Sequence, residues 1–360
     1  MSVWSSYPPD YRAREVNAIV AAARAGDCVS VVGLSGAGKS NLLGFVAHTL
    51  SAPRHVFVLV DGNRLPEPSP AALLAEISRA LGASPAPDAA SAPDAVPSAE
   101  RLEASLAKRL SPAESSVTLL LDRFDVLADS LPLAGRLRAL RDAHKYQLTY
   151  VTATRRPLPS ATELAELFYA HTLWLGVLSE SDARWTVQRF AERARLTWDK
   201  AVAGRLIAAS GGYPSFLRAA CEAHADGAGL EVESLAAHPA VQRRLDEFFA
   251  DRPDEDELRR SGLEGVPLLK ARLQPVAAQA ASLTAKEARL LSYFQAHPGA
   301  VCEKDELIRA VWPEDKVFER GVRDDSLAQL VRRLREKVEA DPASPKHIQT
   351  AAGRGYVYRA

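Results

Sequence analysis

Cysteine, net charge and long apolar runs are all scarce in this chain of 360 residues. Its three cysteines, Cys28, Cys221 and Cys302, stand far apart and lack metal-ligand spacing, which argues against a disulfide framework and fits buried packing in a reducing compartment. Lysine and arginine together number 45, as do aspartate and glutamate. Because the formal net charge is zero, contact with nucleic acid or a membrane would need a local patch of charge.

The sequence also offers no pattern that would carry the chain into a membrane. Its first residues, MSVWSSYPPDYRAR, lack the apolar core of a signal peptide, and no apolar run approaches the roughly 20 residues that span a bilayer. We therefore expect a cytoplasmic protein. The apolar content of 47% and the charged content of 25% are ordinary for a globular chain, and the length allows two or three domains.

What the chain does contain is a phosphate-binding pattern, VSVVGLSGAGKSNLL, over residues 29–43. A β-branched run ends just before Gly33, four residues separate Gly33 from Gly38-Lys39-Ser40, and an apolar helix follows. This is the G-x-x-x-x-G-K-[ST] motif in its strand–loop–helix setting. Glycines let backbone amides turn toward phosphate oxygens, Lys39 supplies a cation, and Ser40 supplies a hydroxyl for Mg²⁺. The motif predicts a site for ATP or ADP with Mg²⁺, with these nucleotide-binding residues: Gly33, Ser35, Gly36, Ala37, Gly38, Lys39, Ser40 and Asn41.

A second apolar segment, SVTLLLDRFD, ends in a carboxylate suited to the same metal. Asp122 closes this predicted strand and is the expected Mg²⁺ ligand beside Ser40, while Asp125 follows three residues later. Arg123 stands where many ATPases carry a glutamate that activates water. Either Asp125 polarises water less efficiently, or hydrolysis is slow and the nucleotide acts mainly as a switch.

A third predicted strand, residues 148–154, ends at Thr154, and Arg155 and Arg156 follow it. Ligands of open parallel sheets lie at the carboxyl ends of the strands, so the Thr154 hydroxyl and the Arg155 guanidinium could sense a terminal phosphate. Two exposed arginines are the plain alternative. The catalytic candidates are thus Lys39, Asp122, Asp125 and Arg155.

The order of these patterns predicts an α/β fold with several parts. Strands at 29–32, 54–61, 116–122, 148–154 and 172–175 alternate with helices and predict a doubly wound, parallel-sheet P-loop NTPase core over residues 1–177. An Ala/Pro/Ser-rich insertion at 82–98 predicts a flexible surface loop. An all-helical lid follows at 178–262, with a Gly-Gly-Tyr-Pro turn at 211–214 and an acidic break at 253–257, and a weakly patterned connector follows at 263–282.

Residues 283–360 form a separate unit in this prediction. Helices at 285–297, 304–312 and 325–338 precede two short strands around a glycine turn at 353–355, which is the order of a winged helix-turn-helix domain. Cations crowd the third helix and flank the strands, as suits an element lying in a DNA groove. A solvated helix face or a protein-binding winged helix are the alternatives. The candidate DNA-binding residues are Arg323, Ser326, Gln329, Arg332, Arg333, Arg335, Lys337, Lys346 and Arg354.

Residues from about 11 to 250 resemble the STAND branch of AAA+-like ATPases, close in layout to archaeal ATPases and origin-recognition proteins. The matching segments are Arg14-Glu15 in the leading helix, the phosphate loop, LLLDRFD, TATRR and the GGYP turn. The resemblance implies a switch that is closed with ADP and opens or oligomerises on exchange for ATP. It adds Arg14, Thr154 and Pro214 to the nucleotide site, with Pro214 near the adenine and Arg155 near the γ-phosphate.

Residues 283–360 resemble the OmpR/PhoB-type DNA-binding domain through LTAKEARLLSYFQAHPG, LIRAVWP, LVRRLREKVEADP and PKHIQTAAGRGYVY. The resemblance implies a recognition helix at about 325–338 and a wing arginine that enters the minor groove. Two positions depart from the pattern. Asp324-Asp325 open the helix where many members have basic or neutral residues, and Ala352 stands at the usual wing position, two residues before Arg354.

Together these features predict an ATP/ADP-dependent STAND-type switch that binds duplex DNA and acts as a signal-responsive transcriptional or defence regulator. One alternative is a sensor or adaptor of an anti-phage system, whose winged helix binds a protein partner or effector. A second is an initiator- or loader-like DNA-dependent ATPase, which Arg123 disfavours. Nucleotide-dependent oligomerisation is open in each case.

Overall fold

The computed structural model describes residues 3–82, 98–111, 115–158, 163–168, 171–272, 283–312, 324–339, 342, 345–351 and 353–359. The chain divides into two compact units, Met1–Leu268 and Leu269–Ala360. The finer boundaries at residues 177, 262 and 282 stay predictions. Among the helices in the described ranges, none combines the length and the apolar character needed to cross a membrane.

Five parallel strands form the centre of the first unit, in the order β2-β3-β4-β1-β5. Every residue of β1 and β4 is buried, as expected for strands covered on both faces. This parallel sheet confirms the predicted α/β core. The strands are β1 (Val29–Val32), β2 (His55–Asp61), β3 (Ser116–Asp122), β4 (Leu148–Thr154) and β5 (Thr172–Trp174).

The register of the sheet brings the predicted site residues to one edge. Asp61 at the end of β2 pairs with Asp122 at the end of β3, and Thr154 at the end of β4 pairs with Val32, just before the phosphate loop. Because parallel strands point their carboxyl ends the same way, these polar side chains meet above one end of the sheet.

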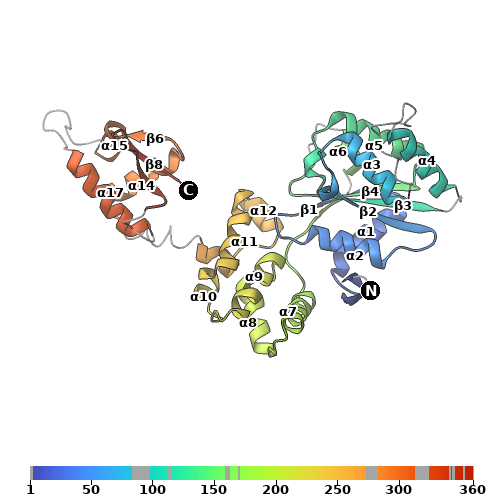
Figure 1. Ribbon diagram of the computed structural model, residues 1–360, viewed down its shortest axis with the longest axis horizontal. Coiled ribbons are helices and arrows are strands. Elements are labelled where there is room, and N and C mark those ends of the chain that lie inside the picture. Colours follow the sequence, from blue (N-terminus) through green and yellow to red (C-terminus); the bar gives the residue numbers. More distant parts are fainter. Residues whose placement is uncertain are drawn as a thin grey trace. The chain divides into compact units, whose positions relative to one another are not determined.

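Helices cover both faces of the sheet. Figure 1 shows α1 and α2 on one face and α3, α4, α5 and α6 on the other, which makes the doubly wound layering. The elements are η1 (Val3–Ser6), α1 (Ala13–Ala25), α2 (Lys39–Thr49), η2 (Gly62–Arg64), α3 (Pro70–Ala80), α4 (Ser98–Leu110), η3 (Phe124–Leu127), α5 (Leu131–Ala143) and α6 (Glu163–Phe168).

Helix α4 begins where the sequence predicted the end of a flexible insertion. Its Leu102, Leu106 and Leu110 are buried and recur every four residues, so the helix packs one apolar stripe against the core. Most of the predicted insertion, residues 83–97, lies outside the described residues.

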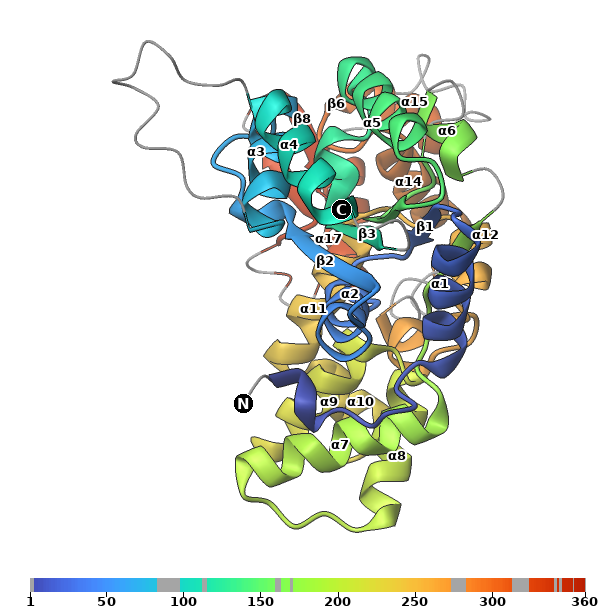
Figure 2. The same ribbon diagram turned by 90° about the vertical axis from the view of Figure 1, so that its right-hand side faces the viewer.

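Among the described residues, the helices α7 to α12 form a bundle that we call the lid. Figures 1 and 2 show this bundle next to α1 and α2. It contains α7 (Glu180–Ala194), α8 (Lys200–Ser210), α9 (Pro214–Ala225), α10 (Val232–Ala237), α11 (Pro239–Ala250) and α12 (Glu255–Arg260).

The predicted acidic break at 253–257 is wrong in one respect, because most of it opens helix α12. The Asp254 side chain accepts a hydrogen bond from the Glu257 backbone amide at 2.8 Å, and the Glu257 side chain accepts one from the Asp254 amide at 3.1 Å. This reciprocal capping box satisfies two of the amides that a helix start leaves unpaired. The acidic residues therefore start a helix instead of interrupting one.

The second unit is a winged helix, as predicted. Three helices pack on an antiparallel sheet in the order β6-β8-β7 around buried Leu290, Phe294, Leu307 and Leu327. Strand β6 has only three residues, too few for a readable alternation of polar and apolar side chains, and it escaped prediction. The elements are α14 (Ala285–Ala296), β6 (Val301–Glu303), α15 (Lys304–Val311), α17 (Asp324–Val338), β7 (Ile348–Ala351) and β8 (Gly355–Tyr358).

All three cysteines are buried and free, in agreement with the predicted packing role. The Cys28 sulfur accepts a hydrogen bond from the Tyr150 backbone amide at 3.3 Å. Burial raises the pKa of the Cys28 thiol to about 11 and that of Cys221 to about 12, so both stay protonated near neutral pH.

Candidate nucleotide site and winged-helix face

The phosphate loop presents a set of unpaired backbone amides. Gly36 and Gly38 have φ angles of 87° and 89°, in the left-handed region that glycine tolerates best, and α2 starts without a side-chain cap. Within the described part of the chain, the amides of Gly36, Gly38, Lys39 and Ser40 have no hydrogen-bond acceptor. A cluster of free amides at a helix N-terminus is the arrangement that binds phosphate oxygens, so this loop fits a nucleotide.

Lys39 lies folded back onto this loop. Its ammonium group donates hydrogen bonds to the carbonyl oxygens of Gly33 and Leu34. Burial lowers its pKa, and the nearby carboxylates of Asp125, Asp122 and Asp251 oppose that shift. The ammonium is therefore a desolvated cation with two neutral acceptors, which phosphate oxygens can replace.

Ser40 and Asp122 form the oxygen pair expected of a Mg²⁺ site. The Ser40 hydroxyl and the Asp61 carboxylate both lie close enough to the Asp122 carboxylate to shift its pKa. Burial raises the pKa of Asp122, the bonds from Ser40 and the Arg123 amide lower it, and Asp61 raises it again. Hydroxyl and carboxylate oxygens are ligands that Mg²⁺ prefers, and phosphate and water oxygens commonly fill its remaining positions. The residues present fit that ion.

No carboxylate follows Asp122 directly. Arg123 has a left-handed φ of 54°, and its guanidinium donates to the Asn63 side-chain oxygen at 2.6 Å on the exposed surface. The carboxylate of Asp125, in η3, instead accepts a hydrogen bond from the Arg155 backbone amide. Asp125 thus fixes the strand end that carries Arg155.

Thr154 and Arg155 line a cavity of about 590 Å³ together with Asp125 and Asp251. The buried Thr154 hydroxyl has no hydrogen-bond partner among the described residues, so a buried donor is left for a ligand or water. Arg155 is 53% exposed, and its Nη1 atom lies 2.8 Å from Oδ1 of Asp251. Arg156 also contacts Asp251, because it donates to the Asp251 backbone oxygen at 3.1 Å. Both arginines are exposed, and both bond to Asp251.

The lid touches the phosphate loop through the turn before α9. The Tyr213 hydroxyl donates to the Ser35 carbonyl at 2.8 Å, and the Ser215 amide donates to the Gly36 carbonyl at 3.2 Å. A side chain at Gly36 would come within 2.1 Å of the Ser215 hydroxyl, so this close approach requires glycine. Pro214 lies between these contacts and next to Gly38.

The arginine that reaches the phosphate loop is Arg12, which the sequence did not single out. Arg12 is 2% exposed and donates through Nη2 to the carbonyl oxygens of Ala37, at 2.9 Å, and Gly176, at 3.0 Å. Its backbone amide donates to the Asp182 carboxylate at 3.1 Å. Arg14, which the family resemblance had assigned to the nucleotide, is exposed on α1, and no contact joins it to the described phosphate loop. The assignment of Arg14 to the nucleotide stays a prediction.

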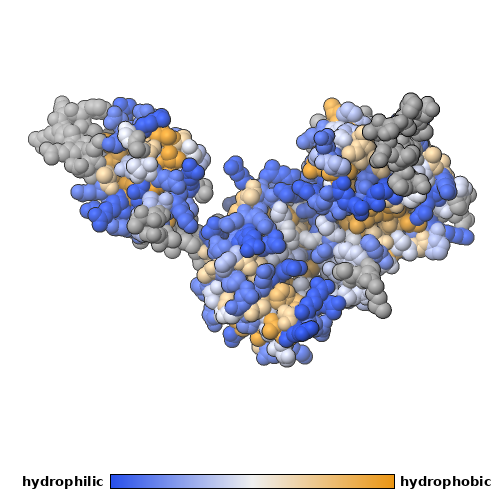
Figure 3. All heavy atoms as spheres, in the orientation of Figure 1, coloured by the Kyte–Doolittle hydropathy of each residue, from blue (hydrophilic) through white to orange (hydrophobic). Residues whose placement is uncertain are grey.

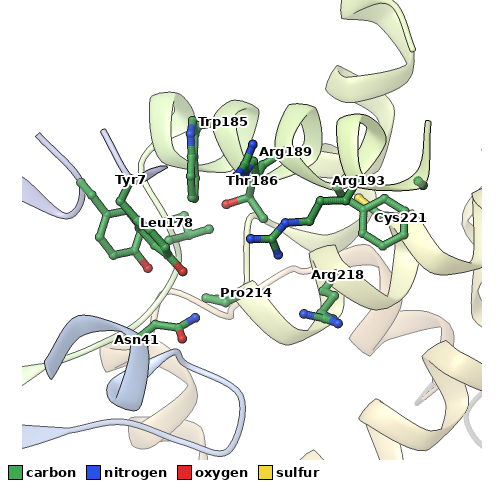
Figure 4. Close-up of a pocket in the computed structure, with 13 residues that line it drawn as sticks. Tyr7, Asn41, Leu178, Trp185, Thr186, Arg189, Arg193, Pro214, Arg218 and Cys221 are labelled. Carbon is green, nitrogen blue, oxygen red and sulfur yellow. The ribbon is translucent and has the colours of Figure 1, made fainter. Parts of the chain in front are cut away.

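A pocket of about 340 Å³ lies between the first turn of α2, the N-terminal segment and the lid (Figure 4). Its aromatic wall contains Tyr7 and Trp185, whose ring centroids lie 4.5 Å apart, and Asn41 and Pro214 line it from α2 and α9. Figure 4 shows these side chains around the same space, together with Arg189, Arg193 and Arg218. The flat aromatic rings of this pocket suit a base. The sequence pointed to Asn41 and Pro214 but missed the aromatic residues.

The second unit exposes one polar face of α17. Ser326, Gln329, Arg332 and Arg333 are exposed on this helix, opposite buried Leu327, Leu330, Val331 and Leu334. Figure 3 shows mainly hydrophilic atoms over the visible part of α17, located by its place in Figure 1. Lys346 and Arg354 are also exposed, beside the small sheet.

Two of the predicted DNA contacts on α17, Arg335 and Lys337, bond to other elements of the second unit. Arg335 donates to the Ile348 carbonyl and to the Thr350 hydroxyl, each at 2.9 Å, and so ties α17 to β7. Lys337 donates to the buried Glu287 carboxylate at 2.7 Å. Of the four cations of α17, Arg332 and Arg333 are exposed, whereas Arg335 and Lys337 bond to neighbouring elements of the unit. Arg323 and Ala352 lie outside the described residues.

Comparison with known proteins assigns the chain to a family. A family model described as Novel STAND NTPase 1 matches residues 11–294, more than half of the chain. The chain belongs to this family. A second model, described as Transcriptional regulatory protein, C terminal, matches residues 278–358 of this novel STAND NTPase. Both resemblances noted in the sequence are thereby confirmed.

Curated relatives are transcriptional and sensory regulators. The uncharacterized transcriptional regulatory protein YcbL of Bacillus subtilis is 31% identical over 130 residues, which are 35% of this chain and 53% of YcbL. The sensory transduction protein RegX3 of Mycobacterium leprae is 37% identical over 106 residues, covering 29% of this chain and 52% of RegX3. The novel STAND NTPase spans about half the length of these relatives.

Solved structures with a similar layout are ATPases of low sequence identity. A Walker-type ATPase of Pyrococcus abyssi matches 99% of this chain and 97% of its own, with 13% identity and a TM-score of 0.44. The ORC2 protein of Aeropyrum pernix matches 94% and 97%, with 17% identity and a TM-score of 0.43. Likeness at this level carries no argument about the function of the novel STAND NTPase.

Proposed function

We propose that this novel STAND NTPase is a nucleotide-controlled transcriptional regulator that binds ATP or ADP with Mg²⁺ and binds duplex DNA through its winged helix. The observation that carries the nucleotide part is the set of unpaired amides at Gly36, Gly38, Lys39 and Ser40. The DNA part is supported by the exposed polar face of α17 and by the family of the C-terminal domain.

In this proposal each residue of the nucleotide site has one task. The loop amides and Lys39 bind phosphate oxygens, while Ser40 and Asp122 hold the metal ion. Bound Mg²⁺ would neutralise phosphate charge and so assist phosphoryl transfer. Asp125 positions Arg155, which senses the terminal phosphate. Since Arg123 follows Asp122, no glutamate activates water there, and we expect slow hydrolysis that suits a switch.

The aromatic pocket completes the nucleotide site in this proposal. Tyr7, Trp185 and Pro214 receive the base, and Asn41 lies on the side toward the phosphate loop. Because these residues come from the N-terminal segment, α7, α9 and α2, a bound nucleotide contacts both the core and the lid. Binding can therefore change the stability of the lid.

On the second unit, the proposed DNA contacts are the exposed residues of α17 and the two cations beside the sheet. Arg332 and Arg333 contact phosphates or base edges, and Ser326 and Gln329 share their helix face. Lys346 and Arg354 contact the DNA backbone beside the helix. Arg335 and Lys337 hold the unit together.

Binding to random duplex DNA over a range of salt concentrations tests this proposal, with ADP and with a non-hydrolysable ATP analogue. We expect a steep dependence of the affinity on salt that differs between the two nucleotides, because phosphate contacts release counterions. Arg289→Ala, which removes an exposed arginine of α14, is the matched control for Arg332→Ala. Absence of DNA binding with either nucleotide would contradict the regulator and favour a protein-binding winged helix.

A further inference from the structure

One acidic residue of the lid lies in the phosphate site of the core. Asp251 follows α11, and its side chain is 10% exposed. Its Oδ2 atom accepts a hydrogen bond from the Ser35 amide at 3.1 Å, and its Oδ1 atom lies 2.8 Å from Nη1 of Arg155. Both carboxylate oxygens are thus used by donors of the core.

These donors are of the kind that bind a phosphate. Ser35 belongs to the phosphate loop, whose amides turn toward anions, and Arg155 directly follows β4, the strand beside that loop. The Asp251 carboxylate also acts on the ammonium of Lys39. An amide and a guanidinium therefore bind one carboxylate, as they would bind a terminal phosphate.

The lid also contacts the loop through groups other than Asp251. The Tyr213 hydroxyl and the Ser215 amide bond the Ser35 and Gly36 carbonyls without any charge. These neutral contacts involve loop carbonyls, whereas Asp251 takes a loop amide and an arginine. The Asp251 carboxylate therefore competes with an anionic ligand for these two donors, whereas the Tyr213 hydroxyl and the Ser215 amide do not.

We propose that Asp251 determines the preference of the site for nucleoside diphosphate over triphosphate, because its carboxylate occupies the Ser35 amide and the Arg155 guanidinium. This inference rests on the proposed nucleotide function. A triphosphate must displace the carboxylate from both donors, whereas a diphosphate can leave it in place. Displacement breaks the charged contact between the lid and the core, which links the identity of the nucleotide to the position of the lid.

The test uses Asp251→Asn, which removes the charge at nearly constant shape. Calorimetric titration of the full chain with Mg²⁺ and either ADP or a β,γ-imido ATP analogue gives two dissociation constants. We expect the triphosphate-to-diphosphate ratio of these constants to fall about tenfold in Asp251→Asn, the effect of one charge-assisted hydrogen bond. Asp251→Glu restores the charge, and we expect it to bring the ratio back toward the wild-type value.

The matched control is Glu247→Gln on the same helix. Glu247 pairs with Arg244 at 2.6 Å on the surface, away from the phosphate loop. We expect the ratio to be unchanged in this variant. A second readout needs no nucleotide: hydrogen exchange of residues 33–40 should be faster in Asp251→Asn than in the wild type, because a neutral amide oxygen is a weaker acceptor for the Ser35 amide than the carboxylate.

The outcomes separate this inference from the proposal on which it rests. If the wild type binds both nucleotides and Asp251→Asn leaves their ratio unchanged, Asp251 has no role in selectivity and the nucleotide function stands. If the wild type binds neither nucleotide, the nucleotide function fails, and the inference fails with it. A lowered ratio that Glu restores and Glu247→Gln does not reproduce supports the inference.

Discussion

The phosphate-loop unit and the winged-helix unit place their functional charges in opposite surroundings. In the first, Arg12 is buried, and Lys39 and Arg155 each have a partner within the site. In the second, Arg332 is 81% exposed and pairs with Glu336, one turn along the same helix. Charges in a desolvated site interact strongly over short distances, whereas exposed charges are screened by salt.

Because of this difference, the two units should respond differently to the same kind of substitution. Removing a charge from the first unit leaves carbonyl or carboxylate groups without their donors, so the effect is large and insensitive to salt. Removing an exposed cation from α17 changes a long-range attraction, so the effect is small and depends on salt. Four experiments, ordered by expected effect, sharpen this comparison.

The largest effect is expected for Lys39→Ala. Its ammonium is the cation held within the phosphate loop, and we expect the affinity for ADP and for an ATP analogue to fall about 100-fold. Titration calorimetry measures both constants. Lys108→Ala on α4 removes an exposed lysine and should leave them unchanged. Normal nucleotide binding by Lys39→Ala would refute the assigned site.

Arg12→Ala should destabilise the first unit by about 2 kcal/mol, because the Ala37 and Gly176 carbonyls lose a buried donor. Urea denaturation measures the free energy of unfolding. The control is Arg14→Ala, two residues away and exposed on α1, for which we expect a change within about 0.5 kcal/mol. Equal losses in the two variants would contradict the distinction that the structure draws between these arginines.

Replacing both Arg332 and Arg333 by alanine should weaken DNA binding about tenfold and reduce the salt slope by about 0.9 for each DNA phosphate that the protein no longer neutralises. The affinity is measured over a range of salt concentrations. Arg335→Ala is a useful contrast, because Arg335 donates to β7 and its replacement should lower thermal stability. An unchanged slope in the double variant would remove α17 from the DNA interface.

The smallest effect concerns acid stability of the second unit. Burial alone would raise the pKa of Glu287, but hydrogen bonds from Lys337 and Thr284 outweigh it, so its pKa is lowered. The resulting stabilisation is complete above the unfolded pKa of about 4.3 and is lost as the pH falls through the lower folded value.

We expect Glu287→Gln to lower the free energy of unfolding of the second unit at neutral pH by about 1 kcal/mol. We also expect this free energy to decrease less as the pH falls than it does in the wild type. Hydrogen exchange of α14 peptides, corrected for the intrinsic rate at each pH, measures this change. Glu336→Gln on the exposed side of α17 is the control, since its partner Arg332 is open to solvent. A parallel acid profile in Glu287→Gln and the wild type would contradict a role for this ion pair.

Much of the nucleotide site could be predicted from local sequence. The strand, the glycine turn and the helix start are adjacent in the chain, so their pattern fixes the phosphate loop at Gly33–Ser40. The pairing of Ser40 with Asp122 also followed, because parallel strands bring their carboxyl ends to one edge. The winged helix was predictable for the same reason, since periodic apolar residues mark its helices.

Contacts between distant segments escaped prediction. Asp251 lies 216 residues from Ser35, and Asp182 lies 170 residues from Arg12. Arg12 and Arg14 both lie at the start of α1, and the neighbouring sequence does not show which of them is buried. Likewise, Arg335 and Lys337 looked equivalent to Arg332 and Arg333 until the fold placed Ile348 and Glu287 beside them.

The sequence by itself determined the phosphate loop, the parallel α/β core and the winged helix, because hydrophobic periodicity and turn chemistry act between near neighbours. Only the tertiary structure decided which charges are buried, which are paired and which remain exposed. That decision depends on how the lid packs on the core and how α17 packs on its sheet, since a side chain's electrostatic role is set by its three-dimensional neighbours.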